Sequence, residues 1–418
     1  MNCKPYAVEP IVRLGPSCGE EGLLGAFFTS DGLICAYAVG NDLTSAKLAC
    51  FKTVRPPFDA HDTPVVQSDN AGRIMVMASA HRSRPIWLMS EPRAGIQGLV
   101  DVTDKLPEEM DDATYPSLLR LSDSGSLRLI YRLGGPARSQ WRLSEWDSDT
   151  GSWGPARSLL SGISKDTWPT GPYPCPPIPL PGDRFGVAYC WRSRSVEHGT
   201  DKPMNIGIDY VDCAGDISSV RTAGGISLSI PVLPSNSERV IAVPWGAELR
   251  NQSGACAIDG QTPCFAGSWR APGQKMQLHF CWLEPAGNWR TVTLTAFAEE
   301  SLLDGPGTLP TLVSRPVVVP AGQGRVVVLY RNSKAGGQLI AQRLRAPNFD
   351  PQDFRPLVLI DGGLDQYEPV VERLSSAASG WLHAYVQRCA QPFGGDKSKH
   401  RESAPARLCS WSLERMFR

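Results

Sequence analysis

The stretch Gly125-Ser126-Leu127-Arg128-Leu129-Ile130-Tyr131 has the pattern that decides the fold. A turn is followed by a short apolar run, which is too short for a helix and typical of a strand. The pattern recurs, so that seven copies follow one another along the chain; the other six are residues 31–37, 72–77, 182–189, 276–282, 324–330 and 380–386. Because a strand unit repeated at roughly 40 to 95 residues is typical of a propeller, we predict an all-β fold, a single seven-bladed β-propeller.

The composition agrees with a chain made of strands and turns. Of the 418 residues, 40 are glycine and 36 are proline, so helices should be scarce. No Ser/Gly tract, charge block or change of composition marks a linker. We therefore expect residues 1–418 to form one catalytic propeller domain rather than two or three domains.

Charge and hydropathy exclude two classes of partner. Lysine plus arginine and aspartate plus glutamate both number 42, so no basic field favours nucleic acid. No run of about eighteen apolar residues predicts a transmembrane helix, and Met1-Asn2-Cys3-Lys4 lacks the apolar core of a signal peptide. We expect neither a nucleic-acid nor a membrane partner.

The twelve cysteines are spread from Cys3 to Cys409 without a Cys-x-x-Cys pair. Three of them fall among apolar residues of expected strands, where a free cysteine packs as a small core residue: Cys35, Cys190 and Cys281. Two pairs are candidates for disulfides: Cys256 with Cys264, and Cys389 with Cys409. His279 and Cys281 share one face of a strand, but without further ligands core packing is the favoured interpretation and no metal ligand is assigned.

Two histidines lie near the ends of expected strands of the second repeat. His61 precedes the strand that begins near Val65, and His81 follows the returning strand, twenty residues later. A strand, a turn and a strand back return the chain to the same end of a blade, so we expect the two imidazoles to lie side by side. A structural role for each histidine is the alternative.

The next two repeats place polar side chains at the same corner. Tyr115 precedes Pro116 and Arg132 follows the returning strand; in the fourth repeat Tyr173 and Arg192 take these places. A single tyrosine before a strand is usually a packing aromatic. The whole set is more polar than core packing requires, so we expect it to form a site.

This set fits elimination from a uronic acid better than hydrolysis. Apart from Asp59 and Asp62, no acids lie close to these positions, so the carboxylate pair of a glycosidase is missing. No nucleophile elbow or phosphate-binding loop is present either. In an elimination, an arginine or histidine neutralises the sugar carboxylate and a histidine or tyrosine removes the adjacent C5 proton. Another histidine or tyrosine protonates O4. Tyrosine has a pKa near 10, and Arg132 is the cation expected to lower it.

In the order and spacing of these motifs the chain resembles the seven-bladed propeller polysaccharide lyases, which include ulvan lyases and the rhamnosyl-glucuronate lyases that act on gum arabic side chains. The resemblance implies that His61 and Tyr115 transfer protons, that His81 and Arg132 bind and neutralise the uronate carboxylate, and that Tyr173 lines the subsite with Arg192. It implies β-elimination at a rhamnose-(1→4)-uronate linkage, with an acidic polysaccharide or oligosaccharide as partner. No cofactor is required for this chemistry.

Two features depart from that family. Asp62 stands where ulvan lyases often carry asparagine, and a structural metal ion cannot be assigned, since Cys190 and His198 do not complete a ligand set. Both suggest a less sulfated substrate. We expect a secreted or periplasmic protein that acts as a monomer.

The competing interpretation is a sialidase-like or non-catalytic carbohydrate-binding propeller. Its support is a degenerate aspartate box, Ser148-Asp149-Thr150-Gly151-Ser152-Trp153, which is one residue short between glycine and tryptophan. Such boxes stabilise turns away from active sites. The Gly-His and Trp-Asp endings of a WD40 propeller are missing.

Overall fold

The computed structural model shows an all-β chain whose strands pair in antiparallel sheets. It describes residues 10–19, 21–29, 33–51, 64–78, 82–163, 170–195, 200–299, 311–389 and 404–418. Each of the seven sequence repeats falls in a different sheet. In the hydrogen-bonded order of the strands, five repeats lie on the second strand of their sheet; the described residues of repeat 31–37 and the repeat 276–282 lie on the third.

The described strands form seven sheets that follow one another in sequence. The first three contain β1 (Ile11–Leu14), β2 (Gly22–Phe28), β3 (Ile34–Val39) and β4 (Ala46–Phe51); β5 (Pro64–Ser68), β6 (Ile74–Ala78), β7 (Ile86–Ser90) and β8 (Leu99–Asp101); and β9 (Ala113–Arg120), β10 (Leu127–Gly135), β11 (Arg138–Asp147), β12 (Ser152–Trp153) and β13 (Arg157–Ser161). The fourth contains β14 (Thr170–Pro174), β15 (Ile178–Leu180), β16 (Arg184–Ser195), β17 (Thr200–Ala214), β18 (Val220–Arg221), β19 (Ser227–Leu228) and β20 (Glu238–Ile241).

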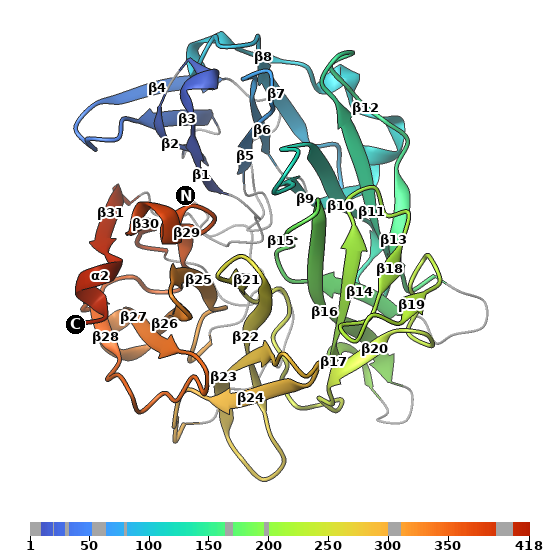
Figure 1. Cartoon of the computed structure of the whole chain (residues 1–418), viewed down its shortest axis with the longest axis vertical. Coiled ribbons are helices and arrows are strands. Elements are labelled where there is room, and N and C mark those ends of the chain that lie inside the picture. Colours follow the sequence, from blue (N-terminus) through green and yellow to red (C-terminus); the bar gives the residue numbers. More distant parts are fainter. Residues whose placement is uncertain are drawn as a thin grey trace.

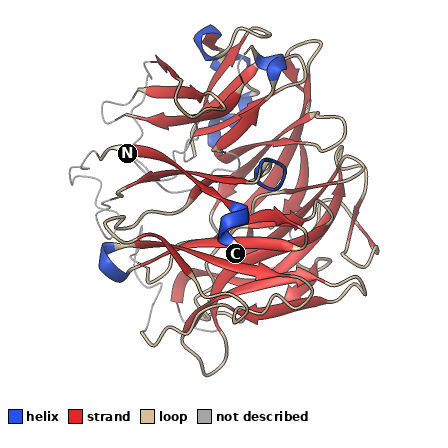
Figure 2. Ribbon diagram, turned by 60° about the vertical axis from the view of Figure 1, so that its left-hand side comes forward, coloured by secondary structure: helices blue, strands red, loops and turns tan. Residues whose placement is uncertain are grey.

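The last three sheets contain β21 (Ala255–Ile258), β22 (Thr262–Arg270), β23 (Met276–Leu283) and β24 (Trp289–Thr293); β25 (Val317–Gly322), β26 (Arg325–Asn332), β27 (Gln338–Arg345) and β28 (Leu357–Ile360); and β29 (Val370–Glu372), β30 (Trp381–Gln387) and β31 (Ala406–Ser412). Helices are scarce, as predicted: α1 (Ser376–Ser379) and α2 (Leu413–Met416), with 3-10 turns at Pro16–Cys18, Ile96–Gly98, Thr103–Lys105, Glu108–Asp112 and Lys334–Gly336 (Figure 2). None of the helices in the described residues is long and apolar enough to span a membrane.

The sheets surround a common centre and form a β-propeller (Figure 1). A separate apolar cluster fills the space between each pair of neighbouring sheets. The alternation along β26 shows why: Val326 and Val328 pack toward the fifth sheet, whereas Val327 and Leu329 pack toward the seventh. A strand buried on both faces reads as a continuous apolar run, which is what the sequence shows.

The ring closes where the seventh sheet meets the first, and β29 contacts β1 (Figure 1). The apolar cluster at this junction is small: Ile11, Leu23 and Val370, with Tyr385 and Leu408 against them. Arg13 adds polar contacts across it. Its Nε donates to Ser375 Oγ at 3.2 Å, and its Nη2 lies 3.2 Å from His383 Nε2.

The cysteine expectations need correction in part. Cys35 forms a disulfide with Cys50, its partner across β3 and β4, so the prediction of a free core cysteine is wrong there. Cys190 and Cys281 are free and buried, as predicted. The two candidate disulfides are not formed: Cys256 and Cys264 face each other with their Sγ atoms 3.5 Å apart but unbonded, and Cys389 is not bonded to Cys409.

The degenerate aspartate box forms the turn between β11 and β12. Asp147 Oδ1 accepts hydrogen bonds from the backbone N–H groups of Asp149 and Thr150, at 2.9 and 3.2 Å. Trp153 then packs against Trp146, with ring centroids 4.9 Å apart. The motif stabilises a turn, as such boxes do.

We predict that acid weakens ring closure through His383. Burial, and then the charge of Arg13, lower the pKa of His383 to about 4 from the ordinary 6.5. As pH falls, His383 is protonated in the unfolded chain before it is protonated in the folded one. The stability is therefore fully present above about pH 6.5 and is lost as pH falls through about pH 4. Thermal unfolding measured across this window should therefore depend less on pH in His383→Gln than in the wild type. An identical pH dependence in the two proteins would contradict the prediction.

Candidate functional site

Tyr115 lies at an irregularity in the innermost strand of the third sheet. The pairing of β9 with β10 shifts between Ile130 and Arg132, so that Thr114 pairs with Arg132 and Ser117 with Ile130. Tyr115 itself has φ +57°, which is uncommon for a residue with a side chain. A β-bulge re-aims a side chain at this point. The ring of Tyr115 consequently packs against Tyr173 of the fourth sheet.

Strand alternation aims Arg132 at the same place. Leu129 and Tyr131 of β10 pack toward the second sheet, and Ile130 packs toward the fourth. Arg132, two residues after Ile130, extends toward the fourth sheet as well and meets Tyr173. Neighbouring strands of two different sheets thus bring their side chains together.

The guanidinium group of Arg132 contacts two tyrosine rings that also contact each other. Its Cζ is 4.7 Å from the centroid of Tyr115 and 5.0 Å from that of Tyr173. The two rings are 6.3 Å apart and inclined by 60°. Their electron-rich faces stabilise a cation through cation–π contacts.

Arg132 has no hydrogen-bond acceptor for two of its nitrogens. The side chain is buried, with 2% of the residue exposed, and no described residue accepts from its Nε or Nη1. A buried polar group without a partner is costly, and a buried charge is normally paired. The geometry therefore suits an incoming anion, since a carboxylate accepts two parallel N–H bonds from one guanidinium group.

Tyr173 is also held by Arg192. The Cζ of Arg192 lies 4.1 Å from the Tyr173 centroid, and its Nη1 donates to Tyr173 Oη at 3.1 Å. Arg192 Nε donates to Asn205 Oδ1 at 2.9 Å and Nη2 to Asn251 Oδ1 at 3.3 Å. Four of the six predicted site residues therefore form one continuous cluster: Tyr115, Arg132, Tyr173 and Arg192. Both tyrosines lie within strands, β9 and β14, rather than before them, because these strands begin earlier than predicted.

His61 and His81 lie outside the described residues, so their predicted pairing is not tested. The described residue that directly follows His81 in sequence is Arg82. Its backbone N–H donates to Ala113 O and to Thr114 Oγ1, both at 3.1 Å. The chain one residue after His81 is thus bonded to the residue directly before Tyr115.

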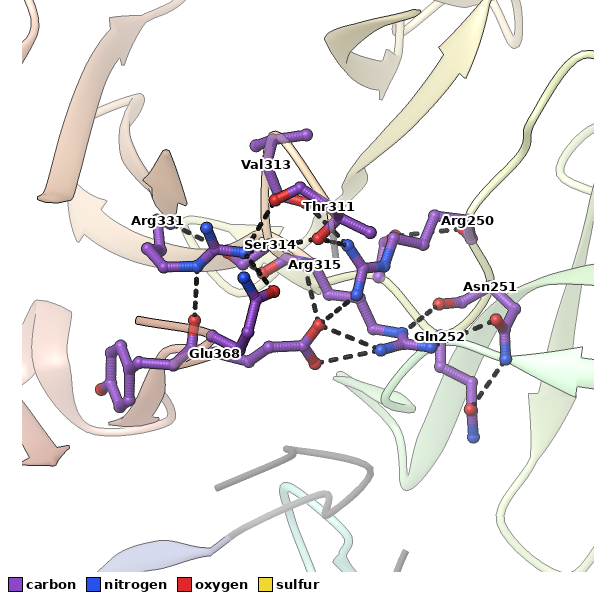
Figure 3. Close-up of polar contacts among 12 residues, drawn as sticks. Arg250, Asn251, Gln252, Thr311, Val313, Ser314, Arg315, Arg331 and Glu368 are labelled. Atoms are coloured by element: carbon purple, nitrogen blue, oxygen red, sulfur yellow. Dashed lines mark hydrogen bonds and ion pairs between the residues drawn. The ribbon is translucent and has the colours of Figure 1, made fainter. Parts of the chain in front are cut away.

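A second polar cluster was missed by sequence reasoning (Figure 3). Glu368 accepts from Arg250 Nη2 at 2.6 Å and from Arg315 Nη1 at 3.0 Å. Arg331 lies beside it, and burial lowers its pKa. Two signals point to these residues. Arg315 and Glu368 each precede a proline near the start of an inner strand, as Tyr115 does, and Tyr330-Arg331 repeats Tyr131-Arg132 at the end of a second strand.

His279 has a core environment, as expected. Its ring stacks on Trp269 with centroids 4.0 Å apart, Nε2 lies 3.2 Å from Trp269 O, and Nδ1 lies 3.2 Å from Thr293 Oγ1. Burial lowers the pKa of His279 to about 4. Within the part of the chain that the structure describes, no three histidine, cysteine or acidic side chains gather as metal ligands do.

Comparisons with known proteins agree with this architecture. A family model for BNR repeat-containing family members matches residues 26–297. The crystal structure of polysaccharide lyase Uly1 superposes with a TM-score of 0.69 at 11% identity, covering 98% of this chain and 91% of the other. A PL25 ulvan lyase bound to -[GlcA(1-4)Rha3S]- superposes with a TM-score of 0.65 at 11% identity, covering 92% of each chain. No curated protein sequence matches. These likenesses show the fold.

We predict that removing the charge of Arg132 leaves the protein about as stable as before. Arg132→Met loses two cation–π contacts, worth about 0.5–2 kcal/mol each, and removes two buried nitrogens without acceptors, Nε and Nη1, which cost about 1–3 kcal/mol each. The two effects offset each other, so the expected net effect lies between a loss of about 2 kcal/mol and a gain in stability.

Arg315→Met is the matched control, because Arg315 is also buried but pairs with Glu368. It leaves that carboxylate short of a partner and should cost about 3–5 kcal/mol. Urea unfolding of both variants measures the difference. Equal destabilisation would show that Arg132 is paired in the free protein.

Proposed function

We infer, since this chain belongs to the BNR repeat-containing family and folds as a β-propeller, that it is a carbohydrate-active enzyme, namely a polysaccharide lyase. The observation that carries the proposal is the buried guanidinium of Arg132, which two tyrosine rings hold and for which no described side chain provides an anion. A uronate carboxylate has the charge and the planar shape to fill that place.

The reaction is a β-elimination. Arg132, with His81, neutralises the uronate carboxylate, so that the adjacent C5–H bond becomes acidic. One member of the pair His61 and Tyr115 removes that proton, and the other gives a proton to O4. The C5–H and C4–O4 bonds break and a C4=C5 double bond forms. The products are an unsaturated uronate and a new chain end that carries the O4 hydroxyl.

Tyr173 and Arg192 line the subsite beside the carboxylate. Their contact with each other and the contact of Tyr173 with Arg132 support this role, since one aromatic ring meets both guanidinium groups. We propose a rhamnose-(1→4)-uronate linkage as the bond cleaved. The support is the PL25 ulvan lyase of similar fold, whose bound -[GlcA(1-4)Rha3S]- consists of these two sugars, a uronate and a rhamnose.

We also propose that residues 1–418 act as one catalytic domain, that each of the seven sheets is one blade, and that the protein acts as a monomer. A secreted or periplasmic location fits a polymeric substrate, and the Cys35–Cys50 disulfide fits an oxidising compartment. Cell fractionation tests the location; recovery of the protein in the cytosolic fraction alone would contradict it.

The test of activity is absorbance at about 235 nm, where an unsaturated uronate absorbs, with ulvan and gum arabic as substrates. The wild type should give a rise on at least one polymer. Tyr115→Phe keeps the aromatic ring against Arg132 but loses the hydroxyl, so its kcat should fall by about 10²- to 10⁴-fold. His81→Ala and Arg132→Met should lose activity as well.

Tyr330→Phe is the matched control, because Tyr330 is a buried tyrosine in the sixth sheet. Its activity should equal that of the wild type. A wild type that produces no unsaturated uronate from either polymer contradicts the proposed lyase on these substrates. Oligosaccharide binding without cleavage, measured on a glycan array, would then establish a carbohydrate-binding propeller.

A further inference from the structure

Asn251 connects the candidate site to the second polar cluster. It precedes β21 in the fifth sheet and is buried, with 5% of the residue exposed. Its Oδ1 accepts from Arg192 Nη2 of the fourth sheet and from Arg315 Nη2, which precedes the sixth sheet, each at 3.3 Å. One amide oxygen thus serves two guanidinium groups.

The orientation of this amide is determined by its surroundings. Guanidinium groups carry donors only, so the oxygen must face them and the nitrogen must face away. Asn251 Nδ2 donates to Gln252 Oε1 at 2.9 Å, which satisfies the other end. A hydrocarbon side chain at this position provides no acceptor to either arginine.

Arg315 holds Asn251 at two points. Besides the side-chain contact, Arg315 Nε donates to the backbone oxygen of Asn251 at 2.7 Å. Arg315 is itself bound by both carboxylate oxygens of Glu368 at 3.0 Å, and Glu368 also accepts from Arg250 (Figure 3). Glu368 is buried, with 2% exposed, so this anchor is shielded from water.

The consequence is a continuous chain of bonds across four sheets. It starts at Tyr173 Oη, passes through Arg192, Asn251 and Arg315, and ends at Glu368. Tyr173 in turn packs on Arg132. A shift of Arg192 would therefore displace Tyr173, and with it the guanidinium group of Arg132, which is proposed to bind the carboxylate.

We propose that Asn251 is a positioning residue, which transmits the fixed geometry of the Arg250–Glu368–Arg315 cluster to Arg192 and Tyr173. This inference rests on the proposed function for its kinetic consequence. Asn251 acts through Arg192 and does not touch the reacting atoms. Its loss leaves Arg192 without one of the two asparagine acceptors that orient it.

The test compares Asn251→Leu, which removes the acceptor at similar size, with Asn251→Asp, which keeps it. In Asn251→Leu, kcat/KM for elimination should fall about 10- to 100-fold, mostly in kcat, because displacement of a positioned group acts on the transition state. Asn251→Asp should stay within about threefold of the wild type. Arg315→Lys keeps a cation beside Glu368 but has one nitrogen instead of a fork, and should show the same loss.

Gln277→Met is the matched control. Gln277 is a buried amide of the same sheet that accepts from Thr295 Oγ1 and Phe297 N and donates to Phe297 O, all away from the site. It should lower the unfolding midpoint as Asn251→Leu does and leave kcat/KM unchanged. If Asn251→Leu also keeps the wild-type kcat/KM, the amide is merely structural and the proposal is overturned. If Asn251→Leu does not fold, Arg315→Lys decides the question by the same criterion.

A crystal structure of Asn251→Leu, or of Arg315→Lys where the leucine variant does not fold, separates this inference from the proposed function. If the wild type shows no elimination, the proposed lyase fails but the positioning role still predicts that Arg192 leaves Tyr173 Oη. An Arg192–Tyr173 contact preserved in the variant would overturn the positioning role. Its loss would support the role whatever the reaction is.

Discussion

The whole structure depends on covering both apolar faces of every sheet. Along β26, Val326 and Val328 face one neighbouring sheet while Val327 and Leu329 face the other, so no sheet is stable with only one partner. A ring is the arrangement in which each sheet has two neighbours. The junction of β1 and β29 completes it, and there a small apolar cluster is supplemented by the contacts of Arg13.

The same alternation builds the candidate site. On β10 the residues that follow Ile130 in steps of two face the fourth sheet, which brings Arg132 to Tyr173. On β16 the equivalent step takes Arg192 toward the fifth sheet, where it meets Asn251. The bulge at Tyr115 is the local exception, and it adds a second ring to the face of Arg132. Site geometry is thus a direct result of strand geometry.

Two kinds of buried arginine serve different purposes in this ring. Arg315 and Arg250 share the carboxylate of Glu368, so their charges are paired within the protein. Arg132 is stabilised by aromatic faces, and its Nε and Nη1 have no acceptors among the described residues. A paired cluster is rigid and suits support, whereas an unsatisfied guanidinium gains most when an anion arrives. The bonds through Asn251 join the two.

The sequence by itself determined the all-β class, the seven strand units and four residues that the structure brings together. The short apolar runs, the turn residues between them and the repeated order of Tyr115, Arg132, Tyr173 and Arg192 are local properties of the sequence, so they can be read without the structure. The Cys35–Cys50 disulfide and the Arg250–Glu368–Arg315 cluster were decided only by the tertiary structure. Arg250 and Glu368 are 118 residues apart, and Asn251 and Arg315 are 64 apart. Such pairs meet because the ring brings loops that are far apart in sequence to one centre. No local sequence pattern records which distant loops will meet there.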